Sequence, residues 1–538
     1  MYHLGLDFGT TNSTLAYMHL TGRLSAFRHG GAQGKEYVPT VVAEGPRNEV
    51  LIGEAALKML DKEGWKVHRF FKMLLACDEP ALLARYGYAK DEPERQAETY
   101  ISRLIEDYKK QNMVYLIHSL VITAPEIWVT EGRHRAREFL QALGRRLGRR
   151  LNIEKVMVRS APQAAIAFFA YRFQQAMKKP FEGLVVCCHC GGWTLDFSVA
   201  QVSSEKILVM RGTGSGRAEG QLGNAGVAFD TGVVEILASN SERNQTLQQN
   251  LLLNFEEQKI IQSDHYRETL ASYLVDPDAD DVLFEVGPGY QVMASHFKRA
   301  FEARVGPSLK TALEKLGVSA QEAASSDRFR VLMVGGSSNL LLVQEAIRCH
   351  FGAAHSADAR FDSCFAAEDV GLAIAKGAAL IAAGDIQIDE KCPISLGVIS
   401  CSLFDMNGGH REYGGTKGYC PVIRRGDLMS ELRLPQFGGP DWFFRLAVGN
   451  IRKIPFFMES EFHCKYEFAL NISGSDLCRE IRPMETFQLG FSVDEDTVFH
   501  LHLRLGRGDD GERPPLPETK FSLGKLLERL RGPIHGRS

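Results

Sequence analysis

Short apolar runs alternate with helical patterns through residues 1–385. Such runs, bounded by turn signals, are typical of buried strands, and apolar residues at helical spacing lie between them. Strand, turn and helix in repetition predict an α/β architecture. The runs are HLGLDFG, SLVITAPEIW, KVMVRSAP, GLVVCCHCGG and FRVLMVGGSS. Because no Pro- or Ser-rich linker interrupts this region, we interpret it as one bilobed unit.

From about residue 392 the apolar positions change to a period of two. In VFHLHLRL, residues Phe499, Leu501, Leu503 and Leu505 share one face, and YEFALNIS and WFFRLAVGN alternate in the same way. Turn signals such as NGG and GDD separate these runs. The pattern predicts a half-buried β domain over residues 392–510.

Two shorter segments complete the chain. Residues 386–391 are interpreted as a linker between the two domains. Residues 511–538 are interpreted as a tail with one short helix, for which Ser522 is a candidate N-cap and Leu523 begins the apolar face. The tail is too short for a helical subdomain.

Composition limits the classes of partner. The chain has 538 residues, of which 44% are hydrophobic, so it can bury several cores. The 63 basic and 66 acidic residues give a formal charge of -3, which provides no global attraction to nucleic acid or an anionic membrane. The first residues lack the pattern of a signal peptide, and no run approaches the roughly 18 apolar residues of a membrane span. We therefore expect a cytoplasmic protein, with neither nucleic acid nor a membrane as partner, whose eleven cysteines are reduced thiols.

Three turns rich in glycine and hydroxyl groups follow apolar runs. They are residues 7–13 (DFGTTNS), residues 191–194 (GGWT) with Asp196 close behind, and residues 335–338 (GGSS). Glycine lets the backbone approach a ligand, consecutive amides and hydroxyls can wrap an anion, and a carboxylate such as Asp7 can hold hydrated Mg²⁺. A single turn of this kind could equally be a hairpin of small residues. Three of them at these separations favour phosphate binding.

With its turns in this order, the sequence resembles the actin-type ATPase fold and, within it, the seventy-kilodalton heat-shock chaperones of the DnaK type. Residues 52–60 (IGEAALKML) and 70–75 (FFKMLL) are similar to the segments that in the family lead to a catalytic lysine. Residues 121–128 (VITAPEIW) contain the family's proline of inter-lobe signalling, and residues 369–380 resemble the helix that closes the second lobe. In these details the sequence is closer to the divergent twelfth-member branch of the family than to the main chaperones.

The resemblance implies a set of site residues. Asp7, Lys72 and Thr194 are the implied catalytic groups, Asp7 is also the implied metal ligand, and Pro125 is the implied signalling residue. Residues 255–263 resemble the adenosine-contacting helix, on which Glu, Lys and Ser recur on one face. The implied cofactors are ATP or ADP with Mg²⁺. The implied nucleotide-binding residues are Gly9, Thr10, Thr11, Asn12, Gly191, Gly192, Glu256, Lys259, Ser263, Gly335, Gly336 and Ser337.

Several positions depart from the family pattern. His189 stands where the family has an aspartate, and an imidazole offers one acceptor or, when protonated, repels a metal. Ala161 stands where the family has a glutamate, and Trp193 replaces a glycine with a bulk that would restrict access to a γ-phosphate. Losing a positioned acid or base typically costs a factor of about 10² to 10⁴ in rate. Ile260 and Asn339 replace two arginines on the adenine side. We expect nucleotide binding to be less compromised than hydrolysis.

The sequence offers other candidate sites. Cys187, Cys188, His189 and Cys190 have metal-ligand chemistry, but alternate residues of a strand face opposite sides, so these four cannot converge on one ion. The basic stretch 131–150 could contact nucleic acid, but a solvated helix face is favoured. His500 and His502 are interpreted as a surface pair on the polar face of a strand.

The sequence therefore predicts an α/β, actin-like, two-lobed nucleotide-binding domain (1–385) followed by a β-sandwich, substrate-binding-like domain (392–510). The linker 386–391 lacks the run of leucines found in the family, which puts nucleotide-driven docking of the domains in doubt. The resemblance implies an ATP-binding chaperone of protein folding and stress response, with weak ATP hydrolysis, unfolded or extended polypeptide clients and possible co-chaperones. A non-catalytic scaffold that has lost nucleotide turnover is the alternative. A small-molecule kinase is disfavoured by the all-β C-terminal region.

Overall fold

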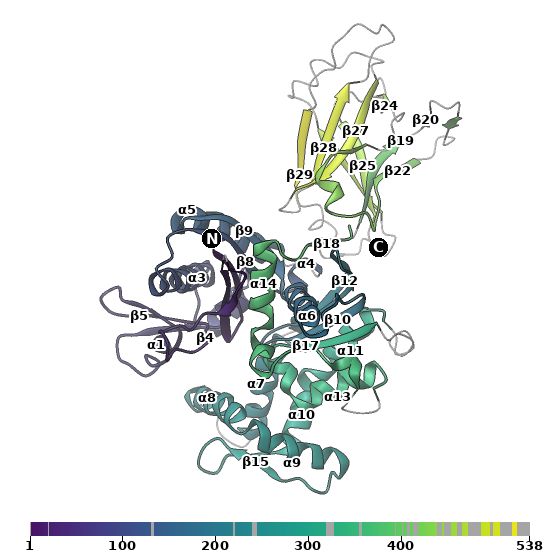
Figure 1. Cartoon of the computed structure of the whole chain (residues 1–538). Helices are drawn as coiled ribbons and strands as arrows, with labels where there is room; N and C mark the ends of the chain where they lie inside the picture. The colour runs from purple at the N-terminus through teal and green to yellow at the C-terminus, as the bar shows by residue number, and fades with distance from the viewer. Residues whose placement is uncertain are drawn as a thin grey trace. The chain divides into compact units, whose positions relative to one another are not determined.

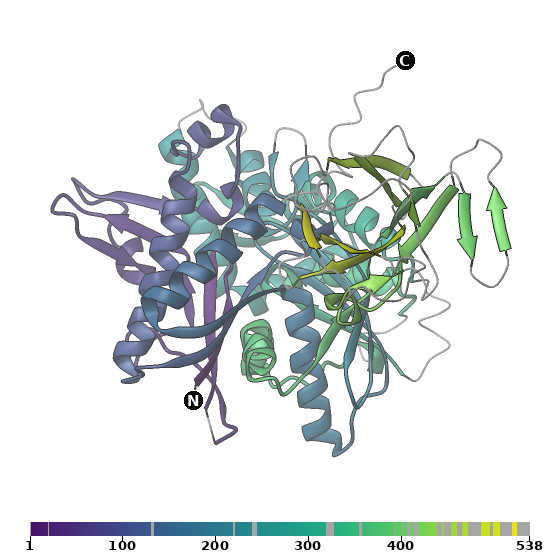
Figure 2. The same cartoon turned by 90° about the horizontal axis from the view of Figure 1, so that it is seen from above.

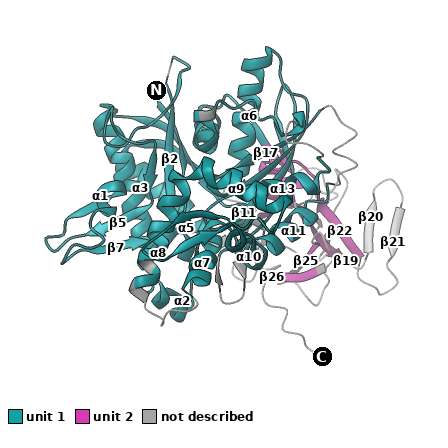
Figure 3. Cartoon of the chain, turned by 90° about the horizontal axis from the view of Figure 1, so that it is seen from below, with its two compact units in different colours: residues 1–388 teal, residues 389–538 magenta. Residues whose placement is uncertain are grey.

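The structure is a computed structural model in which the chain forms two compact units, residues 1–388 and 389–538 (Figure 3). The division falls inside the segment that the sequence indicates as a linker. The structure describes residues 2–19, 21–130, 134–218, 221–238, 245–318, 328–353, 358–392, 394–400, 402–405, 409–412, 418–437, 444–445, 453–459, 465–471, 486–494, 499–505 and 519–524.

The first sheet of unit 1 has the order β3-β2-β1-β8-β9, with β4 paired to β2. Strand β1 runs antiparallel to β2 and parallel to β8, and β9 continues parallel to β8. Three of the predicted apolar runs form β1, β8 and β9. The strands are β1 (Tyr2–Asp7), β2 (Asn12–His19), β3 (Leu24–Ala26), β4 (Tyr37–Pro39), β8 (Ile117–Ala124) and β9 (Ile153–Ser160).

The second sheet repeats this arrangement. Strand β10 runs antiparallel to β11 and parallel to β17, so a hairpin again has a parallel neighbour on its first strand. The remaining two predicted apolar runs form β10 and β17. The strands are β10 (Gly183–Cys190), β11 (Leu195–Val202), β12 (Ile207–Ser215) and β17 (Phe329–Val334), and β18 (Ile388–Glu390) lies at the boundary of the units.

Two helices, α6 (Ala161–Met177) and α14 (Ala373–Ala383), pack against each other between the two sheets (Figures 1 and 2). Their backbones approach closely, because a Cβ at Gly377 would lie 1.7 Å from the Ala164 carbonyl oxygen. A Cβ at Gly5 in β1 would lie 2.2 Å from the Ala375 carbonyl oxygen. The small residues of α14 therefore allow its backbone to approach both α6 and β1.

Smaller elements surround the two sheets of unit 1, and among the described residues no helix combines the length and the hydropathy of a membrane span. The strands are β5 (Val41–Glu44), β6 (Val50–Ile52), β7 (Lys66–Arg69), β13 (Arg217–Ala218), β14 (Gln221–Leu222), β15 (Val282–Glu285) and β16 (Gln291–Met293). The α-helices are α1 (Gly53–Leu57), α2 (Pro80–Arg85), α3 (Glu92–Gln111), α4 (Ile127–Thr130), α5 (His134–Leu151), α7 (Gly226–Leu237), α8 (Gln245–Ile261), α9 (Ser263–Val275), α10 (Ala294–Arg304), α11 (Gly306–Lys315) and α13 (Leu341–His350). The 3₁₀ helices are η1 (Phe71–Leu74), η2 (Gly336–Asn339), η3 (Ala359–Phe361) and η4 (Ala367–Leu372).

Two arginines on the polar face of helix α5 lie close to acidic residues of helix α3. The apolar face of α5 is buried, as the alternation of basic and apolar residues predicts. Arg146 lies 2.7 Å from Glu98 of α3, and Arg150 lies 3.8 Å from Glu106 of the same helix. Acidic partners within the fold therefore satisfy these cations, which supports the helix-face interpretation over nucleic-acid binding.

Unit 2 consists of two antiparallel sheets that share one hydrophobic core. The first has the order β22-β19-β25-β26, the second has the order β23-β27-β28-β29 with β24 on β27, and β20 and β21 form a separate hairpin. Leu396 and Met458 of the first sheet and Phe491 and Leu501 of the second lie in this core. The elements are β19 (Ser395–Ser400), β20 (Ser402–Asp405), β21 (Gly409–Glu412), β22 (Gly418–Ile423), η5 (Glu431–Arg433), β23 (Gln436–Phe437), β24 (Phe444–Arg445), β25 (Lys453–Glu459), β26 (Lys465–Asn471), β27 (Thr486–Val493), β28 (Phe499–Leu505) and β29 (Thr519–Gly524).

Two expectations for unit 2 were wrong. Ser522 and Leu523 lie in strand β29 and not at the start of a helix, because pairing with β28 outweighs the local helical pattern; the rest of the tail, residues 525–538, lies outside the described residues. His500 and His502 are buried and not on an exposed face. Each has a polar partner nearby: the ring Nε2 of His500 lies 2.9 Å from Asp494, and that of His502 lies 2.7 Å from the Ser492 hydroxyl.

Candidate functional site

The first predicted phosphate turn joins β1 to β2, as expected. The Gly9 backbone N–H donates to the Ser13 hydroxyl oxygen at 3.2 Å, which closes the turn. A Cβ at Gly9 would lie 1.8 Å from the Asn12 carbonyl oxygen, so only glycine fits this tight backbone. Thr10 is buried. The turn thus brings several backbone and hydroxyl groups to one edge of the first sheet.

The second and third turns meet the first. A Cβ at Gly192 would lie 3.3 Å from the Thr11 methyl carbon, so the hairpin turns of the two sheets face each other. The Ser337 hydroxyl donates to the Gly191 carbonyl oxygen at 2.8 Å, which ties the third turn to the second. Gly335 has φ +90°, and its Cβ would lie 2.5 Å from the Cys190 carbonyl oxygen. Turns more than 100 residues apart in sequence therefore converge.

Lys72 is buried beside this convergence, in the 3₁₀ helix η1. Its ammonium group donates to the carbonyl oxygen of Phe8 in the first turn and lies 5.3 Å from the Phe8 ring centroid and 5.9 Å from that of Trp128. Burial lowers the pKa of Lys72, and the charges of Asp7 and Asp196 oppose this shift. The predicted lysine is therefore buried at the first turn, within electrostatic range of Asp7 and Asp196.

Both carboxylates are held by hydrogen bonds. The Thr123 hydroxyl donates to Asp7 Oδ1 at 3.0 Å. The fully buried Asp196 accepts the Ile127 backbone N–H at 3.0 Å on Oδ1 and the Thr194 hydroxyl on Oδ2. The sequence placed Asp196 near the second turn without assigning it a role. The signal was a carboxylate at a buried position within the apolar strand LDFSVA.

The ring of His189 lies between the second and third turns. A Cβ at Gly191 would lie 3.3 Å from its Cε1, and a Cβ at Gly335 would lie 2.7 Å from its Cδ2. Its Nδ1 lies 3.5 Å from Asp196 Oδ2. The ring therefore occupies the place at which the turns of the second sheet meet.

The neighbouring cysteines do not join His189 in a metal site. Cys187 packs against the cluster around α6 and α14, whereas Cys188 and Cys190 pack against the core on the other side of the sheet. Burial raises the pKa of all three thiols. The expectation that alternate faces of the strand separate these residues is confirmed.

The side chain of Trp193 points into the core. Its side chain is 1% exposed and packs in the hydrophobic core of the first half of unit 1, where its ring centroid lies 6.4 Å from that of Trp128. A Cβ at Gly223 would lie 2.3 Å from the Trp193 ring. The indole therefore packs in the core, and the expected effect of its bulk on access to a γ-phosphate stays a prediction.

Two further predicted positions, Ala161 and Pro125, directly follow the neighbouring parallel strands β9 and β8. Ser160 caps α6 by accepting the Gln163 backbone N–H at 3.4 Å, so the neighbouring Ala161 opens a well-formed helix without supplying a carboxylate. Pro125 lies in the turn after β8, where its carbonyl oxygen accepts the Trp128 backbone N–H at 3.2 Å. The next residue, Glu126, is buried and accepts from the Ser198 hydroxyl at 3.2 Å. Sequence reasoning did not single out Glu126.

The three residues expected on one adenosine-contacting helix face are divided between two helices. α8 ends at Ile261 and α9 begins at Ser263, so Ser263 does not continue the face of Glu256 and Lys259. Lys259 lies 2.5 and 2.7 Å from the two carboxylate oxygens of Asp230, whose pKa burial raises to about 6 against the opposing effect of Lys259. The expectation of one continuous helix is therefore wrong.

Glu256 forms a long-range ion pair. It lies 2.8 Å from Arg69, a residue 187 positions away at the end of β7. This pair joins the small sheet of β5, β6 and β7 to helix α8. The Tyr88 hydroxyl donates to the Arg69 carbonyl oxygen at 2.7 Å and fixes the backbone from which the guanidinium extends.

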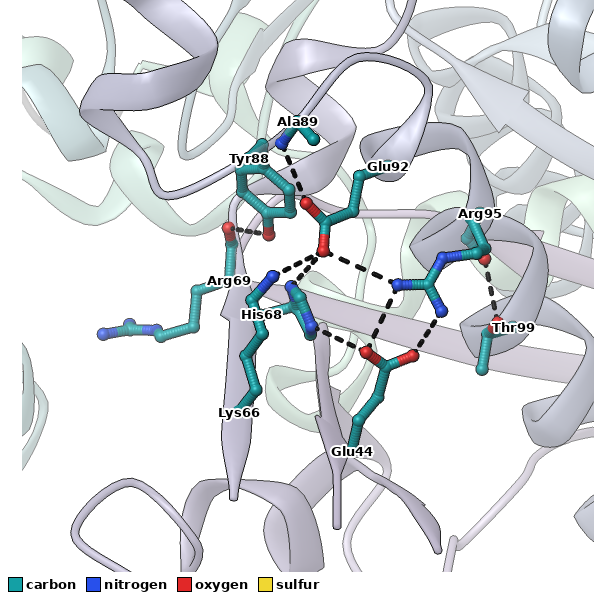
Figure 4. A network of polar contacts seen from close by, with 9 residues as sticks. All are labelled: Glu44, Lys66, His68, Arg69, Tyr88, Ala89, Glu92, Arg95 and Thr99. Carbon is teal, nitrogen blue, oxygen red and sulfur yellow. Dashed lines mark hydrogen bonds and ion pairs between the residues drawn. The ribbon is translucent and has the colours of Figure 1, made fainter. Parts of the chain in front are cut away.

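A network of charged residues supports the same strand (Figure 4). The buried His68 lies between two carboxylates, with Nε2 at 3.1 Å from Glu44 and Nδ1 at 3.9 Å from Glu92. Lys66 lies 2.6 Å from Glu92, and Arg95 lies 2.5 Å from Glu44 and 3.5 Å from Glu92. Burial alone would raise the pKa of Glu44, but hydrogen bonds from Arg95 and its other neighbours lower it to about 2.

Glu44, His68 and Glu92 place three ligand-type atoms within 4.8 Å of one another. Lys66 and Arg95 already neutralise both carboxylates, so the arrangement is that of an ion-pair network and not of a metal centre. Sequence reasoning missed it, because its members come from β5, β7 and α3 and have no common motif.

Comparison with known proteins adds an independent observation. No protein-family model matches this chain. The chain is similar to DnaK. The chaperone protein DnaK of Thermotoga neapolitana is 24% identical over 419 residues, which are 75% of this chain and 64% of the relative. The DnaK of Thermotoga maritima matches with the same identity and coverage. The chain therefore spans 64% of the length of these curated relatives.

This distant similarity supports the resemblance to the seventy-kilodalton heat-shock family that the turns and helices indicate. It also agrees with the mixed α/β composition of the structure. The closer placement in the twelfth-member branch stays a prediction.

Proposed function

We propose that unit 1 binds an adenine nucleotide, with the phosphates at the convergence of the three glycine-rich turns. The observation that supports this most strongly is the contact among these turns around the buried Lys72, in a chain whose curated relatives are DnaK chaperones. Backbone N–H groups and a lysine at a set of tight turns are the groups that proteins use to hold phosphates. In this proposal unit 1 has the two-lobed actin-like fold.

We also propose that unit 2 is a β-sandwich that binds extended polypeptide. β22 and β26 lie at the edges of the first sheet of unit 2, and unpaired backbone groups on such edges can pair with an added strand. Nucleotide binding would modulate this capture, as a chaperone-like role requires. Co-chaperones belong to the same proposal.

ATP hydrolysis is proposed to be weak. Ala161 and His189 supply no carboxylate at positions that the family resemblance assigns to the hydrolytic set. Asp7, Asp196 and Lys72 remain together and can orient phosphates. The site therefore favours binding over turnover.

The test uses the full chain and a fluorescent, extended apolar peptide. We expect saturable peptide binding by fluorescence anisotropy, and a change in peptide affinity when ATP is added. Lys72→Met should abolish the effect of ATP and leave peptide binding in its absence. An absence of peptide binding would refute the chaperone-like role, whereas binding that ignores ATP would refute the coupling.

The second candidate is a scaffold that has lost nucleotide binding. One observation favours it: Glu256 and Lys259, the implied adenosine contacts, already pair with Arg69 and Asp230. A titration of the full chain with ATP that shows neither heat nor a thermal shift would support the scaffold.

A further inference from the structure

We infer that the site in unit 1 binds nucleotide phosphates without requiring a divalent cation. This inference rests on the proposed nucleotide binding and specifies the form of the ligand. The resemblance implies Mg²⁺ held through Asp7, and the groups present around the converging turns do not fit that ion.

Most carboxylate oxygens of Asp7 and Asp196 already accept hydrogen bonds from the protein. Both oxygens of Asp196 accept hydrogen bonds within the protein, from the Ile127 backbone N–H and the Thr194 hydroxyl. Asp7 Oδ1 accepts from Thr123. Among the residues that the structure describes, Asp7 Oδ2 has no hydrogen-bond partner. Mg²⁺ prefers an octahedron of oxygen ligands, to which proteins usually contribute one or two carboxylates. Of these two carboxylates, Asp7 alone keeps an oxygen that accepts no hydrogen bond within the described residues.

The ring of His189 lies beside Asp196, between the second and third turns. Its Cε1 and Cδ2 face Gly191 and Gly335, and its Nδ1 faces Asp196 Oδ2 at 3.5 Å. An imidazole offers nitrogen in place of the hard oxygen that Mg²⁺ selects. The ring therefore places an imidazole, and no oxygen ligand, between these two turns.

The chain itself supplies hydrogen-bond donors for the phosphates. Lys72 is buried at the first turn, where its ammonium group donates to the Phe8 carbonyl oxygen and to no other acceptor within the described part of the chain. The backbone N–H groups of the three turns add fixed dipoles at the same place. A lysine and backbone dipoles can hold phosphate oxygens with no ion between them.

The experiment compares the affinity of the full chain for a fluorescent ATP analogue in Mg²⁺ and in EDTA. We expect dissociation constants that agree within about twofold. An affinity that falls tenfold or more in EDTA would overturn the inference while leaving the proposed nucleotide binding intact. An absence of binding in both buffers would instead overturn the proposed function, and the inference with it.

Two substitutions at one position sharpen the comparison. His189→Asp returns a carboxylate to the site and should make binding at least about tenfold tighter in Mg²⁺ than in EDTA. His189→Asn removes the imidazole without adding a carboxylate, and its affinities should stay equal in the two buffers. Equal Mg²⁺ dependence in both variants would contradict the role assigned to His189, and thermal melts establish that each variant is folded. The wild-type comparison tests the inference even if neither variant folds.

Discussion

The ion pair between Arg69 and Glu256 should hold β7 against α8. The two side chains are 19% and 21% exposed, and the charged atoms lie 2.8 Å apart. Exposed pairs contribute about 0.2 to 1 kcal/mol, and breaking a buried pair costs about 3 to 5 kcal/mol. For this intermediate burial we expect a coupling free energy of about 1 to 2 kcal/mol.

A double-mutant cycle measures that coupling. Arg69→Met and Glu256→Gln each remove one charge, and the double variant removes both. Urea unfolding is followed by tryptophan fluorescence, because Trp128 and Trp193 are buried in unit 1 and report on its integrity. Each single variant should lose about 1 to 2 kcal/mol, and the double variant should lose little more than either single variant.

The matched control is the pair of Arg103 and Glu106 on α3. These side chains are 52% and 38% exposed, and their charged atoms lie 3.5 Å apart. The same substitutions there should give a coupling below about 0.5 kcal/mol. Strictly additive losses at Arg69 and Glu256, or a coupling no larger than that of the control, would refute the reasoning.

Two further predictions concern stability. Gly335→Ala should destabilise unit 1 by about 1 to 3 kcal/mol in urea, because φ is +90° and the new Cβ would meet the Cys190 carbonyl oxygen. Gly336→Ala, where the new Cβ meets nothing within 4 Å, should change stability by less than about 0.5 kcal/mol, so equal losses would contradict the geometry. Glu44→Gln should lower the free energy of unfolding at neutral pH by about 1 to 2 kcal/mol, because the folded state depresses the pKa of Glu44 from 4.5 to about 2. The stability that a depressed carboxylate pKa provides is fully present above pH 4.5 and is lost as the pH falls toward 2. The difference in unfolding free energy between wild type and Glu44→Gln, measured by urea titration, should therefore shrink over that range. A difference that does not change with pH would contradict the role of Glu44.

The sequence predicted those strands and turns that a pattern within one short segment identifies. Five apolar runs became β1, β8, β9, β10 and β17. Strands such as β8 and β10 are buried on both faces, which leaves a run of apolar residues in the sequence, whereas β9 is only partly buried. The positions of the three glycine-rich turns followed from the same runs. The separation of Cys187 from Cys188 and Cys190 followed from the period of a strand.

The features that the sequence did not predict depend on contacts between segments that are far apart in the chain. The pair of Arg69 and Glu256 spans 187 positions, and no pattern in either segment identifies the other. The burial of Trp193 required knowledge of the core formed by the first sheet and its helices. His500 was misplaced because alternation reveals which residues share a face, but not whether the opposite face is covered.

The interruption between α8 and α9 has a similar cause. The offsets of Glu256, Lys259 and Ser263 fit a single helix, and a local pattern alone cannot reveal the break at Gln262. The role of Asp196 likewise became visible only when Lys72 and Ile127 were found beside it.

Calorimetric titration of the full chain with ATP tests the central claim most directly. The converging turns and Lys72 predict saturable binding at one site, with an affinity that falls at least about tenfold in a folded Lys72→Met variant. Saturable binding that Lys72→Met leaves unchanged, or no heat and no thermal shift for the wild-type chain, would contradict the claim.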